Sequence, residues 1–395
     1  MKRSIIILYI VVVAVLAAAT VFEKYQGTEY VSNNIYGAWW FSALWALLVA
    51  VSIFWLIKRK VRRPSVMVLH LSFVVILAGA LLTHLTAVRG VVPLRQGVAT
   101  NTFLTRDMHL HQLPFNICLE HFDVKFYEGT EMPSDYISQV TIDGKPFTIS
   151  MNQIASYRNI RLYQMDYDAD MQGSILSLNY DPWGIPVTYC GYALLFISLI
   201  WILIDPKGRF REQLALLRNH RLQLNIFAAG VLVCFLFLMY HFLNKYSPEN
   251  HPMPVLNSRL LPIHIATIML AYTLLLFACL SSLVGIISAK HRQGMQHLSQ
   301  MMLYPALTFL GFGIFIGAIW ANISWGNYWS WDPKETWAAA TWLSYLTYIH
   351  YRRFPHNNPR VALWMLIACF VLLQMCWWGI NYLSAAHGNS VHTYG

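Results

Sequence analysis

Charged residues are scarce in this 395-residue sequence. Asp, Glu, Lys and Arg together make up 12% of it, whereas soluble domains carry about 25%. Hydrophobic residues make up 57%. So few ionic groups would not keep so long a chain dissolved in water, and so hydrophobic a chain is not intrinsically disordered. The composition therefore predicts a protein embedded in a lipid bilayer.

Paired cysteines are missing as well. The sequence has six cysteines but no Cys-x-x-Cys pair, which excludes a dithiol redox motif and a covalent cofactor attachment site of that kind. No disulfide framework is indicated. All but Cys118 lie in apolar stretches, so we interpret the cysteines as small buried side chains.

Apolar stretches long enough to cross about 30 Å of hydrocarbon are abundant. We expect about nine transmembrane helices, at residues 4–22, 36–57, 66–88, 185–204, 222–243, 262–288, 301–322, 337–352 and 361–383. The first also resembles a signal peptide, since Ala17-Ala18-Ala19 follows the apolar run, but we favour a retained anchor.

The charges are sorted by side of the membrane. With the start of the chain in the cytoplasm, the basic clusters at 58–63, 207–221, 290–292 and 352–360 are cytoplasmic too, as the positive-inside rule requires. Among the acidic residues, only Asp205 and Glu212 then face the cytoplasm. The net charge of +10 is thus an orientation signal and does not indicate nucleic-acid binding.

Residues 89–184 form the one large segment between the apolar stretches, and the map places it outside. Alternating apolar and polar residues at 116–119, 136–142, 160–165 and 175–180, with an Asp143-Gly144 turn, predict a small β-rich domain. We find no acid pair, activated nucleophile or phosphate loop in it. We therefore interpret it as a scaffold or docking surface.

Four histidines lie at two depths of the predicted membrane. His70 and His350 lie near the cytoplasmic ends of their helices, whereas His264 begins a helix at the outer face and His392 lies in the outer tail. Ligating groups in a bilayer are costly and are functional hypotheses by default. Two imidazoles from facing helices can hold a b-type haem, although each histidine alone is also compatible with a structural role.

A tryptophan-rich segment lies between the seventh and eighth predicted helices. It reads Trp325-Gly-Asn-Tyr-Trp-Ser-Trp-Asp-Pro-Lys-Glu-Thr-Trp337, and charged, Gly and Pro residues interrupt its aromatics. Membrane-interface aromatics usually come singly, so this loop is atypical of an aromatic belt. Its indoles can lie flat against a planar apolar ligand such as a porphyrin, with Lys334 and Arg259 as candidate partners of the carboxylates.

This segment resembles the WWD motif of cytochrome c synthases of the Ccs type (system II). The ending Glu335-Thr336-Trp337 and the tail Val391-His-Thr-Tyr-Gly395 favour that branch of haem-handling proteins. Residues 66–204 resemble the ResB/CcsB partner, so the chain resembles a natural fusion. We divide it into 1–88, three ResB/CcsB-like helices; 89–184, the outer β-rich domain; 185–221, a helix and linker; and 222–395, a CcsA/ResC-like domain with its tryptophan-rich loop at 325–337.

The resemblance implies a cytochrome c haem lyase in a bacterial inner membrane, acting at the periplasmic face. Haem b would bind His70 and His350 first and then His264 and His392, over Trp325, Trp329, Trp331, Asp332 and Trp337. Thioether bonds would form to Cys-x-x-Cys-His of apocytochrome c, which a thioredoxin-like reductant keeps reduced. His387 competes with His392 as the tail ligand.

Two other functions remain open at this point. A haem exporter or chaperone would need the same inner histidines but no surface for an apocytochrome. A b-type electron-transfer cytochrome would need a second helix with a histidine pair to match His70 and His84, and no such pair exists at that spacing.

Overall fold

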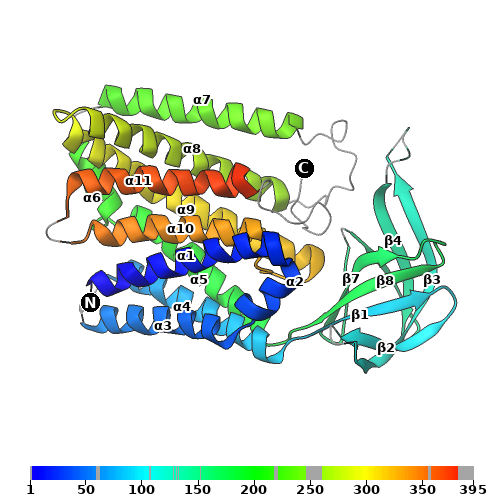
Figure 1. The fold of residues 1–395 in the computed structure, drawn as a ribbon. Coiled ribbons are helices and arrows are strands. Elements are labelled where there is room, and N and C mark those ends of the chain that lie inside the picture. The colour runs from blue at the N-terminus through cyan, green and yellow to red at the C-terminus, as the bar shows by residue number, and fades with distance from the viewer. Residues whose placement is uncertain are drawn as a thin grey trace.

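The computed structural model describes residues 2–58, 63–105, 108–127, 129, 131, 133–151, 153–217, 221–245, 260–354 and 357–380. Its helices form one bundle, and its strands form a separate domain at one end of that bundle (Figure 1). We name this end the β-domain end. The other end is named the basic end, because Lys58, Arg209, Arg292 and Arg353 lie there.

The bundle is built mainly from long helices that run between these two ends. They are α1 (Lys2–Gln26), α3 (Trp39–Lys58), α4 (Pro64–Thr86), α5 (Gly184–Ile204), α7 (Arg221–Lys245), α8 (Leu260–Ile287), α9 (Arg292–Trp325), α10 (Pro333–Tyr351) and α11 (Pro359–Gln374). Shorter pieces are α2 (Thr28–Val31), α6 (Arg209–Leu216) and the π-helical turns η1 (Ser32–Tyr36) and η3 (Met375–Gly379).

Eight helices in the described ranges are long and apolar enough to cross a membrane. The expected span at 337–352 is helical too, as α10, but it is too polar to count among the eight. It lies among α1, α9 and α11, and its hydroxyl side chains at Thr336, Thr341 and Thr347 are buried (Figure 1). Because α10 is enclosed by protein, it does not need an apolar surface toward lipid.

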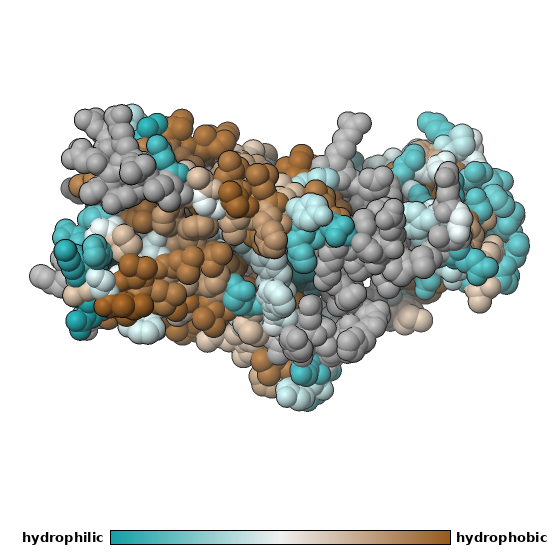
Figure 2. All heavy atoms as spheres, turned by 90° about the horizontal axis from the view of Figure 1, so that it is seen from above, coloured by the Kyte–Doolittle hydropathy of each residue, from teal (hydrophilic) through white to brown (hydrophobic). Residues whose placement is uncertain are grey.

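Apolar side chains cover the sides of the bundle. Figure 2 shows brown, hydrophobic atoms gathered over the helical part, with hydrophilic atoms toward the basic end and over the β domain. An apolar belt between two polar ends is the surface that a bilayer requires. The chain is therefore a multi-pass membrane protein, as its composition predicts.

The β domain is one eight-stranded antiparallel sheet in the order β5-β4-β3-β2-β1-β8-β7-β6. Its strands are β1 (Val88–Arg95), β2 (Ala99–Thr105), β3 (Leu110–Phe126), β4 (Pro133–Ile142), β5 (Lys145–Ser150), β6 (Ala155–Tyr157), β7 (Ile160–Tyr167) and β8 (Gly173–Tyr180). All four predicted strand regions are confirmed, and Asp143-Gly144 forms the β4–β5 turn with positive φ at both residues.

Helices α4 and α5, which carry the β domain, pack very closely. A Cβ atom on Gly79 would lie 2.6 Å from the Thr188 nitrogen, and one on Gly191 would lie 2.8 Å from the Ile76 nitrogen. Small residues let helix backbones approach in membranes, where close packing replaces the hydrophobic effect as the main attraction. The base of the β domain is thereby fixed to the bundle.

Candidate functional site

A cavity of about 1120 Å³ follows the bundle from one end to the other. Side chains of α1, α3, α4, α5, α9 and α10 line it, together with the segment between α9 and α10. Its α4 lining extends from Ser65 to His84, which is nearly the whole helix. Small-molecule pockets usually have about 300–1,000 Å³, so the cavity can hold a large organic ligand.

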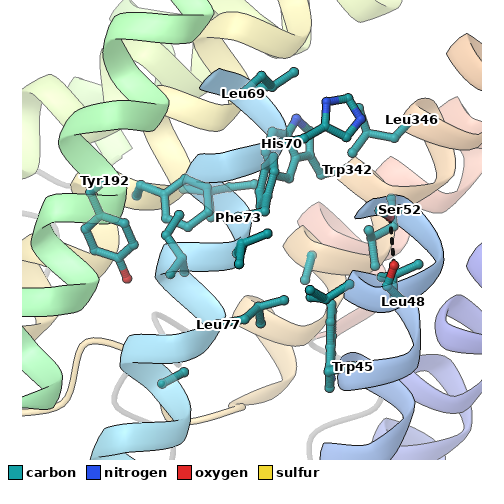
Figure 3. Close-up of a pocket in the computed structure, with 18 of the residues that line it drawn as sticks. Trp45, Leu48, Ser52, Leu69, His70, Phe73, Leu77, Tyr192, Trp342 and Leu346 are labelled. Carbon is teal, nitrogen blue, oxygen red and sulfur yellow. Dashed lines mark hydrogen bonds between the residues drawn. The ribbon is translucent and has the colours of Figure 1, made fainter. Parts of the chain in front are cut away.

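The inner histidine pair lies on this cavity. His70 of α4 and His350 of α10 both line it, and Figure 3 shows His70 next to Trp342 and Leu346 of α10, with Trp45 of α3 farther along the cavity. Each histidine has Nδ1 close to the backbone carbonyl four residues earlier, at 2.8 Å from Val66 O and 2.7 Å from Leu346 O. The fold thus brings together two residues that are 280 positions apart in the sequence.

These two contacts define which ring nitrogen of each histidine is free. A carbonyl oxygen only accepts, so Nδ1 must carry the proton in both rings, and Nε2 keeps its lone pair. Metal-ligating histidines typically donate their other N–H to a carbonyl in this way, which orients the ring. Both imidazoles therefore have the ring orientation and the protonation state that allow Nε2 to ligate a metal.

Three arginines line the basic end of the cavity: Arg63, Arg209 and Arg353. Arg209 also forms an ion pair with Glu212 at 2.8 Å. In the sequence, these arginines indicated only the orientation of the chain in the membrane. Because a guanidinium group pairs well with a carboxylate, this end of the cavity suits a ligand that carries acidic groups.

The tryptophan-rich segment turns sharply between α9 and α10. Gly326 ends α9 in the left-handed conformation, with φ +85°. At the start of α10, Asp332 Oδ1 accepts from Glu335 N at 2.8 Å, and Glu335 Oε2 accepts from Ser330 N at 2.7 Å. Asp332, a predicted ligand-binding residue, is thus the N-cap of α10, and the Asp-Pro-x-Glu order is the sequence signal for that role.

The tryptophans of the segment separate into groups with different surroundings. Trp329 and Trp331 line the cavity, and Trp331 stacks on Tyr36 with ring centroids 5.1 Å apart. Trp337 instead is 5% exposed in the core between α1 and α10, where its Nε1 donates to Thr20 Oγ1 at 3.1 Å. These placements support Trp329 and Trp331 as ligand-binding residues and give Trp337 a packing role.

The cavity also contains polar groups with no partner in the described part of the chain. They are the buried indole nitrogens of Trp45, Trp329 and Trp342. Buried donors are normally hydrogen-bonded, so such groups need an explanation. Three of them around one cavity indicate that it accommodates a ligand with acceptor atoms or ordered water.

His264 lies apart from this cavity. Its Nδ1 is 2.7 Å from Gly313 O, so a backbone carbonyl orients its ring as in the inner pair. Its ring stacks at 6.4 Å on Trp320, which in turn contacts Trp325 at 5.1 Å. None of these three rings is among the lining residues of the large cavity.

Three predicted site residues lie outside the described part of the chain. His392, its alternative His387 and Arg259 lie outside the described residues, so the outer histidine pair stays a prediction. Within the described residues, no three His, Cys, Asp or Glu side chains come together in a group that could hold a metal ion. The six cysteines all lie in described ranges, and none of them forms a disulfide bond.

Two family models match this chain. The one described as cytochrome C assembly protein matches residues 192–387, and the one described as ResB-like family matches residues 55–185. The cytochrome c biogenesis protein CcsA of Chlamydomonas reinhardtii is 33% identical over 165 residues, which are 39% of this chain and 46% of that protein. CcsA of Cuscuta reflexa is 26% identical over 245 residues, 53% of this chain and 76% of that protein.

A third relative is Protein NrfI of Wolinella succinogenes. It is 43% identical over 118 residues, which are 28% of this chain but only 13% of that protein. The chain therefore spans less than half of the length of the Chlamydomonas and Wolinella proteins that it matches.

Proposed function

We propose that the chain, a multi-pass membrane protein in which a ResB-like region precedes a region that matches the cytochrome C assembly model, carries out the haem-handling and haem-attachment steps of cytochrome c biogenesis. Haem b is the substrate, taken up at the basic end and attached at the β-domain end. The observation that carries this proposal is that His70 and His350, each with Nε2 free, line one cavity that continues to Trp329 and Trp331.

The first step is reception of haem between His70 and His350. Neutral imidazole is a common iron ligand, and two of them from facing helices hold a b-type haem without a covalent bond. Arg63, Arg209 and Arg353 would pair with the two propionates at the basic end, and the apolar lining would contact the macrocycle. Because none of these bonds is covalent, the haem remains free to leave.

The second step is attachment at the β-domain end. Each client thiol adds across a haem vinyl group, so that sulfur bonds to the vinyl carbon next to the ring and the thiol hydrogen goes to the outer carbon. This addition exchanges no net electrons. The protein contributes mainly position: holding two reactants in contact provides effective molarities of about 10⁵ M or more. His264 and His392 would ligate the iron there, and the client histidine would replace one of them.

The client in this scheme is an apocytochrome c with a Cys-x-x-Cys-His segment. Its thiols must be reduced to react, which requires a thioredoxin-like reductant because the chain has no Cys-x-x-Cys pair of its own. The proposed location is a bacterial inner membrane, and the distribution of basic residues supports an orientation with the β domain on the outer, periplasmic side.

The test uses the full chain purified in detergent after expression with apocytochrome c. We expect bound haem b in an absorption spectrum and a pyridine haemochrome assay. His70→Gly and His350→Gly should lower haem per protein severalfold and abolish attachment, and added imidazole should restore part of both, because the lost group is a neutral nitrogen donor. His291→Gly is the matched control, since His291 lies at the same end but contacts Ser288 outside the cavity.

The same experiment separates the alternatives. Haem that reaches the β-domain end but never becomes attached would identify an exporter and overturn the synthase proposal. Haem that cycles between oxidation states with a quinol would identify an electron-transfer cytochrome. A colourless preparation from haem-replete cells, or His70 and His350 variants that behave like the His291 variant, would contradict the proposal as a whole.

A further inference from the structure

The β domain contacts the tryptophan-rich segment through a buried polar network. Its centre is Asn322, which is fully buried one turn before the end of α9. The side-chain oxygen of Asn322 accepts from the Arg161 guanidinium of β7 at 2.8 Å and from the Tyr189 hydroxyl of α5 at 2.9 Å. Its amide nitrogen donates to Gly326 O at 3.1 Å. One side chain thus connects the β domain with the first residue after α9.

Gly326 is enclosed by the same network. Its carbonyl oxygen also accepts from the Asn179 side chain of β8, and its nitrogen donates to Asn322 O at 3.2 Å. The Tyr163 ring of β7 lies against it, so that a Cβ atom on Gly326 would come within 2.6 Å of the ring. The turn that directs the chain from α9 into the segment is therefore in contact with two strands of the β domain.

A second connection lies two residues further on. Burial raises the pKa of Tyr328, so its phenol stays neutral and donates to Thr83 Oγ1 at 2.8 Å. Thr83 in turn donates to Asp181 Oδ2 at 2.6 Å, and Asp181 Oδ1 accepts from Gly184 N at 2.8 Å. These residues mark where the chain enters and leaves the β domain. The tryptophan-rich segment is thus held on both sides of Asn327 before it reaches Trp329.

We propose that the β domain sets the conformation of the tryptophan-rich segment, with Arg161 and Asn322 as the positioning residues. The ResB-like region then does more than provide a scaffold: it fixes the indoles that the assembly region presents to haem. The inference deepens the proposed function and rests on it for its consequence, although the coupling itself is measurable without haem.

Two variants interrupt different parts of the network. Asn322→Asp keeps the oxygen that faces Arg161 but places a second oxygen against Gly326 O, so it breaks the connection to the segment. Arg161→Gln is too short to reach Asn322, so it removes the hydrogen bond from the β domain to the Asn322 side chain. Arg158→Gln is the matched control, because Arg158 lies three residues earlier in the same hairpin but contacts Pro114 and Asp143 within the domain.

The measurement is hydrogen exchange by mass spectrometry on the full chain in detergent, without haem. Loss of the Asn322–Gly326 hydrogen bond in Asn322→Asp, and of the Arg161–Asn322 hydrogen bond in Arg161→Gln, should each accelerate exchange in residues 326–331 by about tenfold, and Arg158→Gln should not. Exchange in the rest of the β domain should stay unchanged, which shows that it remains folded. Acceleration in Asn322→Asp alone would mean that Asn322 only caps the end of α9, and this result would overturn the inference. Unchanged exchange in both variants would overturn it as well.

Haem attachment measured in the same variants tests the proposed function separately. If Arg161→Gln accelerates exchange and also lowers attachment while haem at His70 and His350 is retained, the position of the segment matters for the reaction. If exchange accelerates and attachment is complete, the coupling stands, and the role that the proposed function gives to the segment fails.

Discussion

Gly317 lies directly against the imidazole of His264, and a Cβ atom on this glycine would come within 2.7 Å of the His264 ring. The two residues belong to different helices, α9 and α8. The orientation of the ring therefore depends on the absence of a side chain at residue 317. Nothing about Gly317 in the sequence marks it as part of a site.

Replacing Gly317 with Ala should displace His264 while leaving the histidine itself intact. If His264 ligates haem, we expect an altered Soret band and at least a severalfold loss of attached cytochrome. Gly294→Ala is the control: it lies in the same helix with nothing within 4 Å, and Ala is favoured over Gly in helices by about 1 kcal/mol. A Gly317→Ala protein with a normal spectrum and full attachment would argue against His264 as a ligand.

Gly326→Ala should destabilise the protein more than Gly97→Ala. Both glycines have positive φ, which costs a residue with a side chain about 1–2 kcal/mol, but only Gly326 also has a neighbouring ring, Tyr163, in the way. The difference should appear in the thermal unfolding midpoint of the detergent-solubilised protein. Equal midpoints for the two variants would show that the Tyr163 ring moves aside at no cost.

Trp337→Phe and Trp331→Phe should have opposite consequences. The first removes the hydrogen bond to Thr20 in the core, which should cost about 1 kcal/mol of stability without changing haem per folded protein. The second changes an indole that lines the cavity, so it should alter haem content or spectrum with little loss of stability. Haem loss in the Trp337 variant at unchanged stability would restore Trp337 as a ligand-binding residue.

A pH dependence is expected on the β domain, at Arg95. This guanidinium bonds Asp168 at 2.8 Å and Asp170 at 2.9 Å, and it holds the pKa of Asp170 below its usual range. The stabilisation is complete above the usual Asp pKa of about 4 and is lost as the pH falls through the lowered value. It is small, because all three groups are exposed.

The check compares wild-type protein with Asp170→Asn, whose Asn cannot titrate. The difference in unfolding midpoint between them should shrink as the pH is lowered from about 4 through the lowered pKa of Asp170, below which Asp170 is protonated in the folded protein too. Haem content should be the same in both, since the cluster lies on the domain surface. If the difference in unfolding midpoint stays constant with pH, the destabilisation in Asp170→Asn does not come from loss of the ion pair with Arg95.

The amino-acid sequence by itself determined the elements that depend on local pattern. Long apolar runs make helices that cross a membrane, since a helix satisfies all backbone hydrogen bonds within one segment, and alternating runs with an Asp143-Gly144 turn make the β domain. The N-cap at Asp332 could also be predicted from the sequence, because the Asp side chain of an Asp-Pro-x-Glu segment accepts from one of the first backbone amides of the helix. The role of Asp332 in ligand binding stays a prediction beside this capping role.

Only the tertiary structure decided which side chains share a cavity. The direction in which a helical side chain points depends on how its helix is rotated about its axis relative to several neighbouring helices. Uniformly apolar helices have no periodic pattern of polar and apolar residues that would indicate this rotation. Sequence order therefore could not separate Trp331, on the cavity, from Trp337, in the core, or place His264 apart from His70 and His350. The bond from Arg161 to Asn322 spans 161 residues, and only the packing of the β domain on the bundle brings those two side chains into contact.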